Sequence, residues 1–129
     1  MRSRLLALAM AGALLFVACG GAAEASDKVE GQDVVVEMYD NRFQYTEIEV
    51  PVGGTVKWVG AGANPHNAKE ANDLWSTEDV FGSLDQHEGD EAVLTYDRPG
   101  RYVFYCTYHG NAEGDGMAGV LIVGEEGSS

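Results

Sequence analysis

Three side chains with metal-binding atoms lie near one another in the C-terminal part of the sequence. Cys106 is followed at C-x-x-H spacing by His109, and Met117 comes after a further seven residues, 110–116. Three of those seven residues are glycines, so this segment is expected to bend and not to form a helix. A further histidine, His66, lies upstream between a proline and an asparagine.

These side chains offer a thiolate, two imidazoles and a thioether, which is the donor set of a blue-copper centre. In such a centre one cysteine and two histidines form a trigonal set, and a methionine binds weakly along the axis. The set binds copper as both Cu(I) and Cu(II), and the thioether favours Cu(I). Zinc gains little from a thioether, so Met117 indicates copper. Ligation would also protect Cys106, which has no cysteine partner in the chain after residue 19.

Short apolar runs separated by glycine and proline turns supply the elements that must position these ligands. No segment has a convincing apolar period of 3.6, and residues 69–89 are polar and irregular, with room for a short helix. The pattern predicts an all-β fold, an antiparallel Greek-key β-sandwich. The expected strands lie at 34–36, 47–50, 55–59, 92–96, 101–106 and 120–123.

Alternation within the expected strands indicates which side chains face the interior. Tyr102, Phe104 and Cys106 share one face, and the two bulky aromatic residues mark that face as interior. Cys106 is therefore expected at the inner end of a strand, next to the glycine-rich segment. Trp58 and Met38 are expected to be core residues for the same reason.

At this point the sequence resembles a known family, the cupredoxins, and especially the plastocyanin-like and halocyanin-like type 1 blue copper proteins, over residues 33–124. The motifs that carry the resemblance are Gly54-Thr55-Val56-Lys57-Trp58, Pro65-His66-Asn67, Pro99-Gly100-Arg101-Tyr102-Val103-Phe104-Tyr105-Cys106 and Met117-Ala118-Gly119. The resemblance implies that one copper ion is bound, and its implied ligands are His66, Cys106, His109 and Met117. It also implies that Asn67 hydrogen-bonds toward Thr107 and joins the two ligand segments. Plastocyanins have four residues between the second histidine and the methionine, where this chain has seven.

The N-terminal segment has the features of an export signal. Residues 1–18 contain two arginines followed by an apolar run of 14 residues, shorter than the roughly 20 needed to span a bilayer. Phe16-Val17-Ala18-Cys19 resembles a lipoprotein box, in which Cys19 is lipidated; the alternative is ordinary cleavage after Ala25. We expect a signal peptide at 1–18, a flexible tether at 19–32, a cupredoxin domain at 33–124 and a disordered tail at 125–129. The protein is then expected on the periplasmic or cell-surface side of the cytoplasmic membrane, anchored by its lipid.

The charge of the chain is strongly negative. All 21 acidic residues but only six of the eight basic residues follow position 19, which leaves a net charge of −15 on that part. Nucleic acid is effectively excluded as a partner, because its phosphates would be repelled. A basic protein partner, a salty environment and an ordinary solvated surface all remain compatible with this charge.

The sequence predicts an electron carrier and not an enzyme. The expected partners are a redox protein donor and acceptor, such as cytochromes or membrane oxidoreductases. The resemblance implies that electrons pass through the exposed edge of His109. The alternative is a periplasmic copper binding or delivery protein without a redox role. A multicopper oxidase would need more than the three histidines present, and His87 is expected to be merely solvated. A cysteine hydrolase would need a third group to orient His109, and none is evident.

Overall fold

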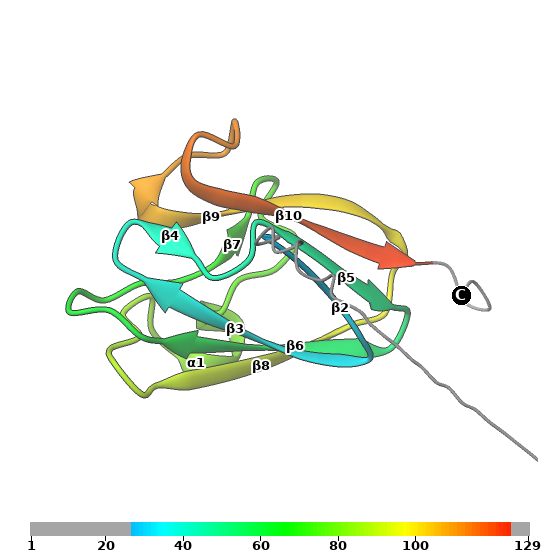
Figure 1. Cartoon of the computed structure of the whole chain (residues 1–129), viewed down its shortest axis with the longest axis horizontal. Coiled ribbons are helices and arrows are strands. Elements are labelled where there is room, and N and C mark those ends of the chain that lie inside the picture. The colour runs from blue at the N-terminus through cyan, green and yellow to red at the C-terminus, as the bar shows by residue number, and fades with distance from the viewer. Residues whose placement is uncertain (1–26, 125–129) are drawn as a thin grey trace, which may run out of the picture.

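Two β-sheets pack face to face in the computed structural model, which describes residues 27–124 (Figure 1). The five-stranded sheet has the spatial order β2 (Lys28–Glu30), β5 (Glu47–Pro51), β10 (Gly116–Gly124), β9 (Gly100–Gly110) and β7 (Lys69–Glu70). The four-stranded sheet has the order β4 (Arg42–Phe43), β3 (Asp33–Tyr39), β6 (Gly54–Gly60) and β8 (Glu91–Tyr96). The predicted sandwich is confirmed.

The pairing within each sheet is mixed, which corrects the expectation of an antiparallel fold. Strand β5 runs parallel to both β2 and β10, and β3 runs parallel to β6. The pairs β9–β10, β7–β9, β3–β4 and β6–β8 are antiparallel. The reason lies in the connections: the short turn after β5 leads into β6 of the other sheet, so β5 and β6 do not pair with each other. Parallel neighbours are therefore brought together from distant parts of the chain.

The folded part begins earlier than the sequence indicated. Lys28–Glu30, inside the expected tether 19–32, forms β2 and pairs with β5, with Val29 opposite Ile48. Val29 is the single apolar residue of this three-residue strand. A strand this short has no alternating pattern by which the sequence could predict it. The expected signal peptide, Cys19 and the tail 125–129 lie outside the described residues. Within 27–124, no helix is long and apolar enough to cross a membrane.

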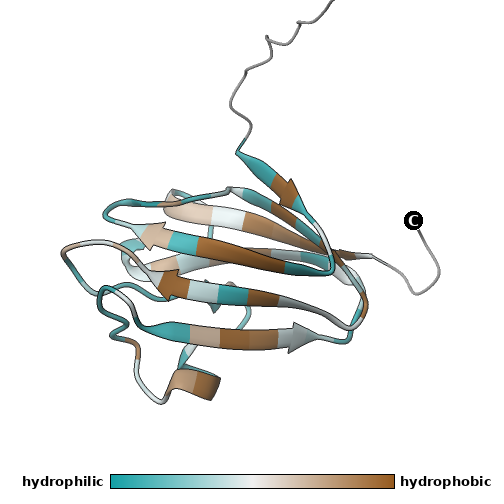
Figure 2. Cartoon of the chain, turned by 60° about the horizontal axis from the view of Figure 1, so that its bottom comes forward, coloured by the Kyte–Doolittle hydropathy of each residue, from teal (hydrophilic) through white to brown (hydrophobic). Residues whose placement is uncertain are grey.

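Buried side chains that alternate along the strands form a hydrophobic core rich in aromatic residues between the two sheets. Hydrophobic and hydrophilic positions follow one another along the strands in Figure 2. In β6, Val56 and Trp58 are fully buried while their neighbours are partly exposed. Phe104 lies edge-on to Trp58, with ring centroids 5.1 Å apart, and Trp75 stacks on Trp58 at 5.9 Å. Met38 is also fully buried, as predicted. This packing gives the strands that end at the site a rigid support.

The irregular segment 69–89 contains the expected short helix. It is the single turn α1 (Glu78–Phe81), which ends at Gly82 in the left-handed conformation, with φ 89°. The Thr77 hydroxyl accepts a hydrogen bond from the Ala68 amide at 3.1 Å. The segment is thereby tied to the chain next to His66 and Asn67.

Candidate metal centre

An irregularity in the pairing of β9 with β10 brings the predicted ligands together. Gly116 lies opposite Gly110, and the next register pair is Ala118 with Tyr105. Residues 106–109 of β9 therefore lie opposite Met117 alone. This bulge places Cys106, His109 and Met117 at one point of a single hairpin. The ligand segment thus lies within two strands, which corrects the expectation that β9 would end near Cys106 and β10 would begin after Met117.

The turn between these strands is held by glycine geometry and by one asparagine. Gly116 has φ 73°, and a Cβ atom there would lie 2.4 Å from the carbonyl oxygen of His109, so only glycine fits. The Asn111 side-chain oxygen accepts hydrogen bonds from the amides of Glu113 at 3.0 Å and Asp115 at 3.1 Å. Asn111 was not singled out from the sequence; its place at the start of a glycine-rich turn was the available signal.

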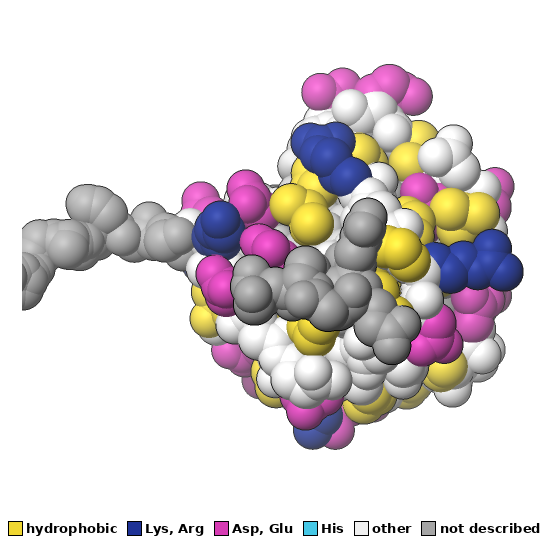
Figure 3. Space-filling view, turned by 90° about the vertical axis from the view of Figure 1, so that its right-hand side faces the viewer, with side chains coloured by type: hydrophobic (Ala, Val, Ile, Leu, Met, Phe, Trp, Pro, Cys, Tyr) yellow, Lys and Arg dark blue, Asp and Glu magenta, His cyan; other side chains and the backbone are white. Residues whose placement is uncertain are grey.

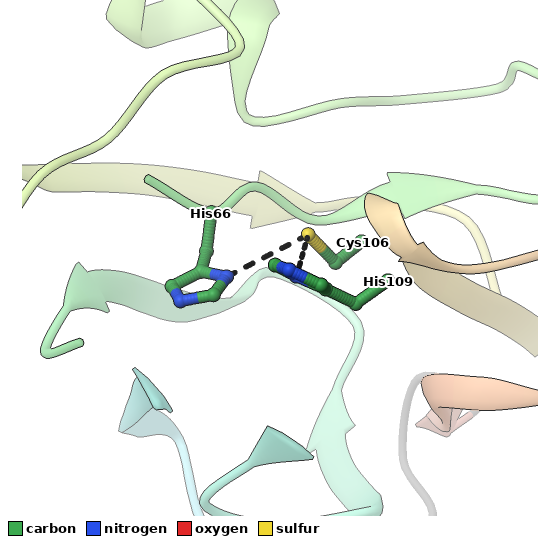
Figure 4. A group of neighbouring side chains, drawn as sticks. All are labelled: His66, Cys106 and His109. Atoms are coloured by element: carbon green, nitrogen blue, oxygen red, sulfur yellow. Dashed lines mark hydrogen bonds between the residues drawn. The ribbon is translucent and has the colours of Figure 1, made fainter. Parts of the chain in front are cut away.

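Three nitrogen and sulfur donors face one another beside this hairpin (Figure 4). The Sγ atom of Cys106 lies 3.8 Å from Nδ1 of His66 and 3.9 Å from Nδ1 of His109. All three donor atoms lie within 4.8 Å of one another. Cys106 and His66 are fully buried, whereas His109 is partly exposed.

These separations fit a shared metal ion. With bond lengths like those of zinc, about 2.3 Å to thiolate and about 2.0 Å to imidazole, a trigonal angle of about 120° separates sulfur from nitrogen by about 3.7 Å. The observed 3.8 and 3.9 Å agree with that value. Met117 is 1% exposed in the same core cluster as Cys106 and supplies the thioether. The donor set and its trigonal spacing indicate copper.

The backbone of His66 is fixed by a short bridge to Gln86. The His66 amide donates to the Gln86 carbonyl at 3.0 Å, and the Gln86 amide donates to the His66 carbonyl at 3.1 Å. Gln86 is itself fully buried, and its side-chain amide donates to the Trp58 carbonyl at 3.1 Å. The position of His66 is thus tied to the aromatic core.

The far side of the His66 ring meets a carboxylate that was missed from the sequence. Nε2 of His66 lies 2.9 Å from Oδ1 of Asp40. The Asp40 carboxylate also accepts hydrogen bonds from two backbone amides, that of Asn64 at Oδ1 and that of Ala63 at Oδ2. The hydrogen bond from His66, followed by those from the amides of Asn64 and Ala63, lowers the pKa of Asp40 to about 2. Asp40 lies in the turn between β3 and β4, far from the ligands in sequence, where an Asp-Asn pair reads only as a turn.

Asn67 and Thr107 join the two ligand segments. The Asn67 side-chain amide donates to the Thr107 hydroxyl at 2.9 Å, and the Thr107 amide donates to the Asn67 side-chain oxygen at 3.0 Å. Asn67 is fully buried and Thr107 is partly buried, so the Asn67 side of these hydrogen bonds is shielded from water. The residue after His66 and the residue after Cys106 are therefore held side by side.

The remaining histidine lies apart from this cluster. His87 is exposed, and its Nδ1 atom lies 3.9 Å from the Asp90 carboxylate. It is not a member of the donor group formed by His66, Cys106 and His109. Among the described residues, the structure therefore brings together the histidines that the sequence motifs selected and leaves the third one solvated.

The sandwich and its His-Cys-His-Met donor set define a cupredoxin with a single type 1 copper site. The sequence matches the family described as "Copper binding proteins, plastocyanin/azurin family" over residues 31–124, and the chain belongs to this family.

Relatives and solved structures agree with this assignment. Amicyanin of Paracoccus denitrificans is 30% identical over 85 residues, which cover 66% of this chain and 64% of the relative. The chloroplastic plastocyanin of Physcomitrium patens is 32% identical over 121 residues, which cover 90% of this chain and 66% of the relative. The chain thus spans slightly less than two thirds of each. A purple cupredoxin from Nitrosopumilus maritimus shares the fold, with a TM-score of 0.54, 21% identity, and coverage of 70% of this chain and 98% of that chain.

Proposed function

We propose that the protein carries single electrons between redox proteins through one copper ion held by His66, Cys106, His109 and Met117. The observation that carries the proposal is the trigonal spacing of the Cys106 sulfur and two imidazole nitrogens within a rigid sandwich. When bound, copper supplies the Cu(I)/Cu(II) couple. The residues around the site hold and shield the ligands, and electron transfer of this kind requires no catalytic group.

The protein's own part in this function is to hold the donors in one arrangement and keep water out. Cys106 and Met117 are buried, and His66 is fixed through both its backbone and its ring. A donor set that cannot relax favours fast electron transfer, because little rearrangement accompanies the change of charge. His109 is the partly exposed ligand, so its edge is the route we assign to the electron.

The test is spectroscopy and voltammetry of the copper-loaded protein. We expect intense visible absorption, an EPR spectrum with narrow copper hyperfine splitting, and a reversible one-electron couple. Cys106→Ser should abolish the colour, whereas His87→Ala, which changes an exposed histidine outside the cluster, should leave it unchanged. A colourless oxidised protein, or colour that survives Cys106→Ser, would refute the proposal.

The same measurements separate the proposal from copper delivery without a redox role. A delivery protein would bind Cu(I) alone and release it quickly to a chelator. The complete burial of Cys106 and His66 argues for slow release, because the donors must be uncovered before they can be exchanged. Rapid transfer of copper to a competing chelator, with no reversible couple, would favour delivery.

We further propose that the protein is exported and anchored through lipid on Cys19, and that its donor and acceptor are other exported or membrane redox proteins. Support for export comes from the charged and apolar pattern of residues 1–18 and the box that precedes Cys19. Mass spectrometry of the mature N-terminus tests this point. Acyl chains on Cys19 are expected, and a mature protein that begins at Ser26 would contradict the anchor.

A further inference from the structure

A carboxylate is built into contact with the buried copper ligand His66. Asp40 Oδ1 lies 2.9 Å from Nε2 of His66, while the opposite ring nitrogen, Nδ1, faces the Cys106 sulfur. The side chain of His66 is 0% exposed and that of Asp40 is 37% exposed. The ring therefore lies between the metal-binding donors on one side and an anion at the edge of the protein on the other.

The position of this carboxylate is fixed by the loop that leads to His66. Its Oδ2 atom accepts a hydrogen bond from the Ala63 amide at 3.1 Å, and its Oδ1 atom accepts one from the Asn64 amide, also at 3.1 Å. The Asn64 side-chain amide lies 3.4 Å from the same Oδ1 atom. Asp40 thus cannot turn away from His66 without breaking its hydrogen bonds to the backbone amides of Ala63 and Asn64.

Gly62 leaves the space in which the two side chains meet. A Cβ atom at this position would lie 2.3 Å from Asp40 Oδ1 and 2.8 Å from His66 Nε2. Both separations are far below a normal contact, so any side chain at position 62 would force the carboxylate or the imidazole to move. The contact thus depends on three residues from two loops.

We propose that Asp40 is a positioning residue for the copper site: it holds His66 in the tautomer that carries its proton on Nε2, and its charge lowers the reduction potential. A neutral imidazole with its proton on Nε2 must present the lone pair of Nδ1 toward the other donors. A carboxylate behind the ring also makes the imidazole a stronger donor. The negative charge favours the more positive metal state, Cu(II), over Cu(I). The inference about the potential rests on the proposed function, whereas the inference about the tautomer does not.

The tautomer is tested in the metal-free protein by nitrogen-15 NMR of the histidine rings. We expect His66 of the wild type to carry its proton on Nε2 alone. Asp40→Ala should give a mixture of the two tautomers, and Asp40→Asn, which keeps an acceptor oxygen, should retain the wild-type form. Gly62→Ala keeps the charge but obstructs the contact, so it should behave like Asp40→Ala. An unchanged tautomer in both Asp40→Ala and Gly62→Ala would overturn the positioning role.

The charge effect is tested by metal affinity and voltammetry of the same variants. Asp40→Asn and Asp40→Ala should both raise the midpoint potential, and Asp40→Ala should weaken Cu(II) binding by at least about tenfold. Asp97→Asn is the matched control, because it removes an exposed acid near the opposite end of β9 and should shift neither value. A midpoint potential that is equal in the wild type and Asp40→Asn would overturn the charge effect. A wild type without a reversible couple would refute electron transfer, while the tautomer and the Cu(II) affinity would still decide whether Asp40 positions His66.

Discussion

The two histidines of the site are chemically identical but differ in surroundings. His66 is fully buried and is fixed by Gln86 along its backbone and by Asp40 behind its ring. His109 lies in β9 at the edge of the site, is partly exposed, and contacts the Tyr108 ring with centroids 6.4 Å apart. One imidazole is therefore part of the interior, and the other is within reach of solvent and partners.

This difference predicts that only one of the histidines can be replaced by a small molecule. In His109→Gly, added imidazole should enter from solvent and restore the visible absorption of the copper-loaded protein. In His66→Gly the same ligand should fail, because the cavity is closed by buried neighbours such as Gln86. Titration of both variants with imidazole, followed by absorption and EPR spectra, is the measurement. Equal restoration in the two variants would contradict the assigned difference in access.

At the scale of elements, the site is a property of the β9–β10 hairpin and not of either strand alone. The shift of register between Gly116 and Ala118 places Met117 opposite residues 106–109. Regular pairing would have spread these side chains along both faces of the sheet, because successive residues of a strand alternate in direction. The bulge is what turns three positions in the sequence into one cluster.

Gly116 should therefore be more sensitive to substitution than Gly114, the other glycine of this turn with a positive φ. Gly116→Ala combines a left-handed backbone with a close approach to the His109 carbonyl oxygen, and we expect it to destabilise the metal-free protein by more than about 2 kcal/mol. Gly114→Ala is the matched control, because Gly114 has a similar φ of 93° but its nearest neighbour would lie 3.8 Å away. Gly114→Ala should lower the free energy of unfolding only by the strain of the left-handed backbone, about 1 kcal/mol. Denaturant unfolding of both variants measures this difference, and equal costs would contradict the role of the close approach.

At the scale of the whole molecule, acidic side chains far outnumber basic ones. They are spread over the face seen in Figure 3, and basic side chains occur there at separate points. Within residues 27–124, ion pairs between lysine and an acid join Lys28 to Glu47, Lys57 to Glu91, and Lys69 to Asp73. Acids far outnumber lysine and arginine within residues 27–124, so these exposed pairs cannot neutralise most of the acidic side chains there. We therefore expect repulsion between like charges to destabilise the folded state.

Salt should relieve this repulsion and stabilise the protein. Raising sodium chloride from about 0.01 M to about 1 M shortens the screening length from about 30 Å to about 3 Å. We expect the Tm of the metal-free protein to rise by at least about 4 °C, which corresponds to roughly 1 kcal/mol for a domain of this size. Thermal unfolding followed by circular dichroism is the measurement. A Tm that is flat or falls with salt would show that the surface charges are not strongly repulsive.

Local features of the chain were readable without the fold. The types and spacing of Cys106, His109 and Met117 are visible in the sequence and indicate a metal site. The alternation of apolar and polar residues around Trp58 indicates which face of that strand is buried. Contacts between residues that are far apart in the sequence were harder to predict. β2 has only Val29 as an apolar residue, and the parallel pairings join strands that the turns do not connect. Motif resemblance selected His66, but no motif pointed to Asp40 or Gln86.

The sequence by itself determined the kinds of donor available, the interior face of each main strand and the acidic surface, because each of these depends on residue type and on neighbours along the chain. Only the tertiary structure decided that Asp40 lies within hydrogen-bonding distance of His66 and that the backbone of Gln86 pairs with that of His66. It also decided that a bulge places Met117 opposite residues 106–109. The physical reason is that these contacts join distant segments, and their geometry is set when both sheets close on a common core.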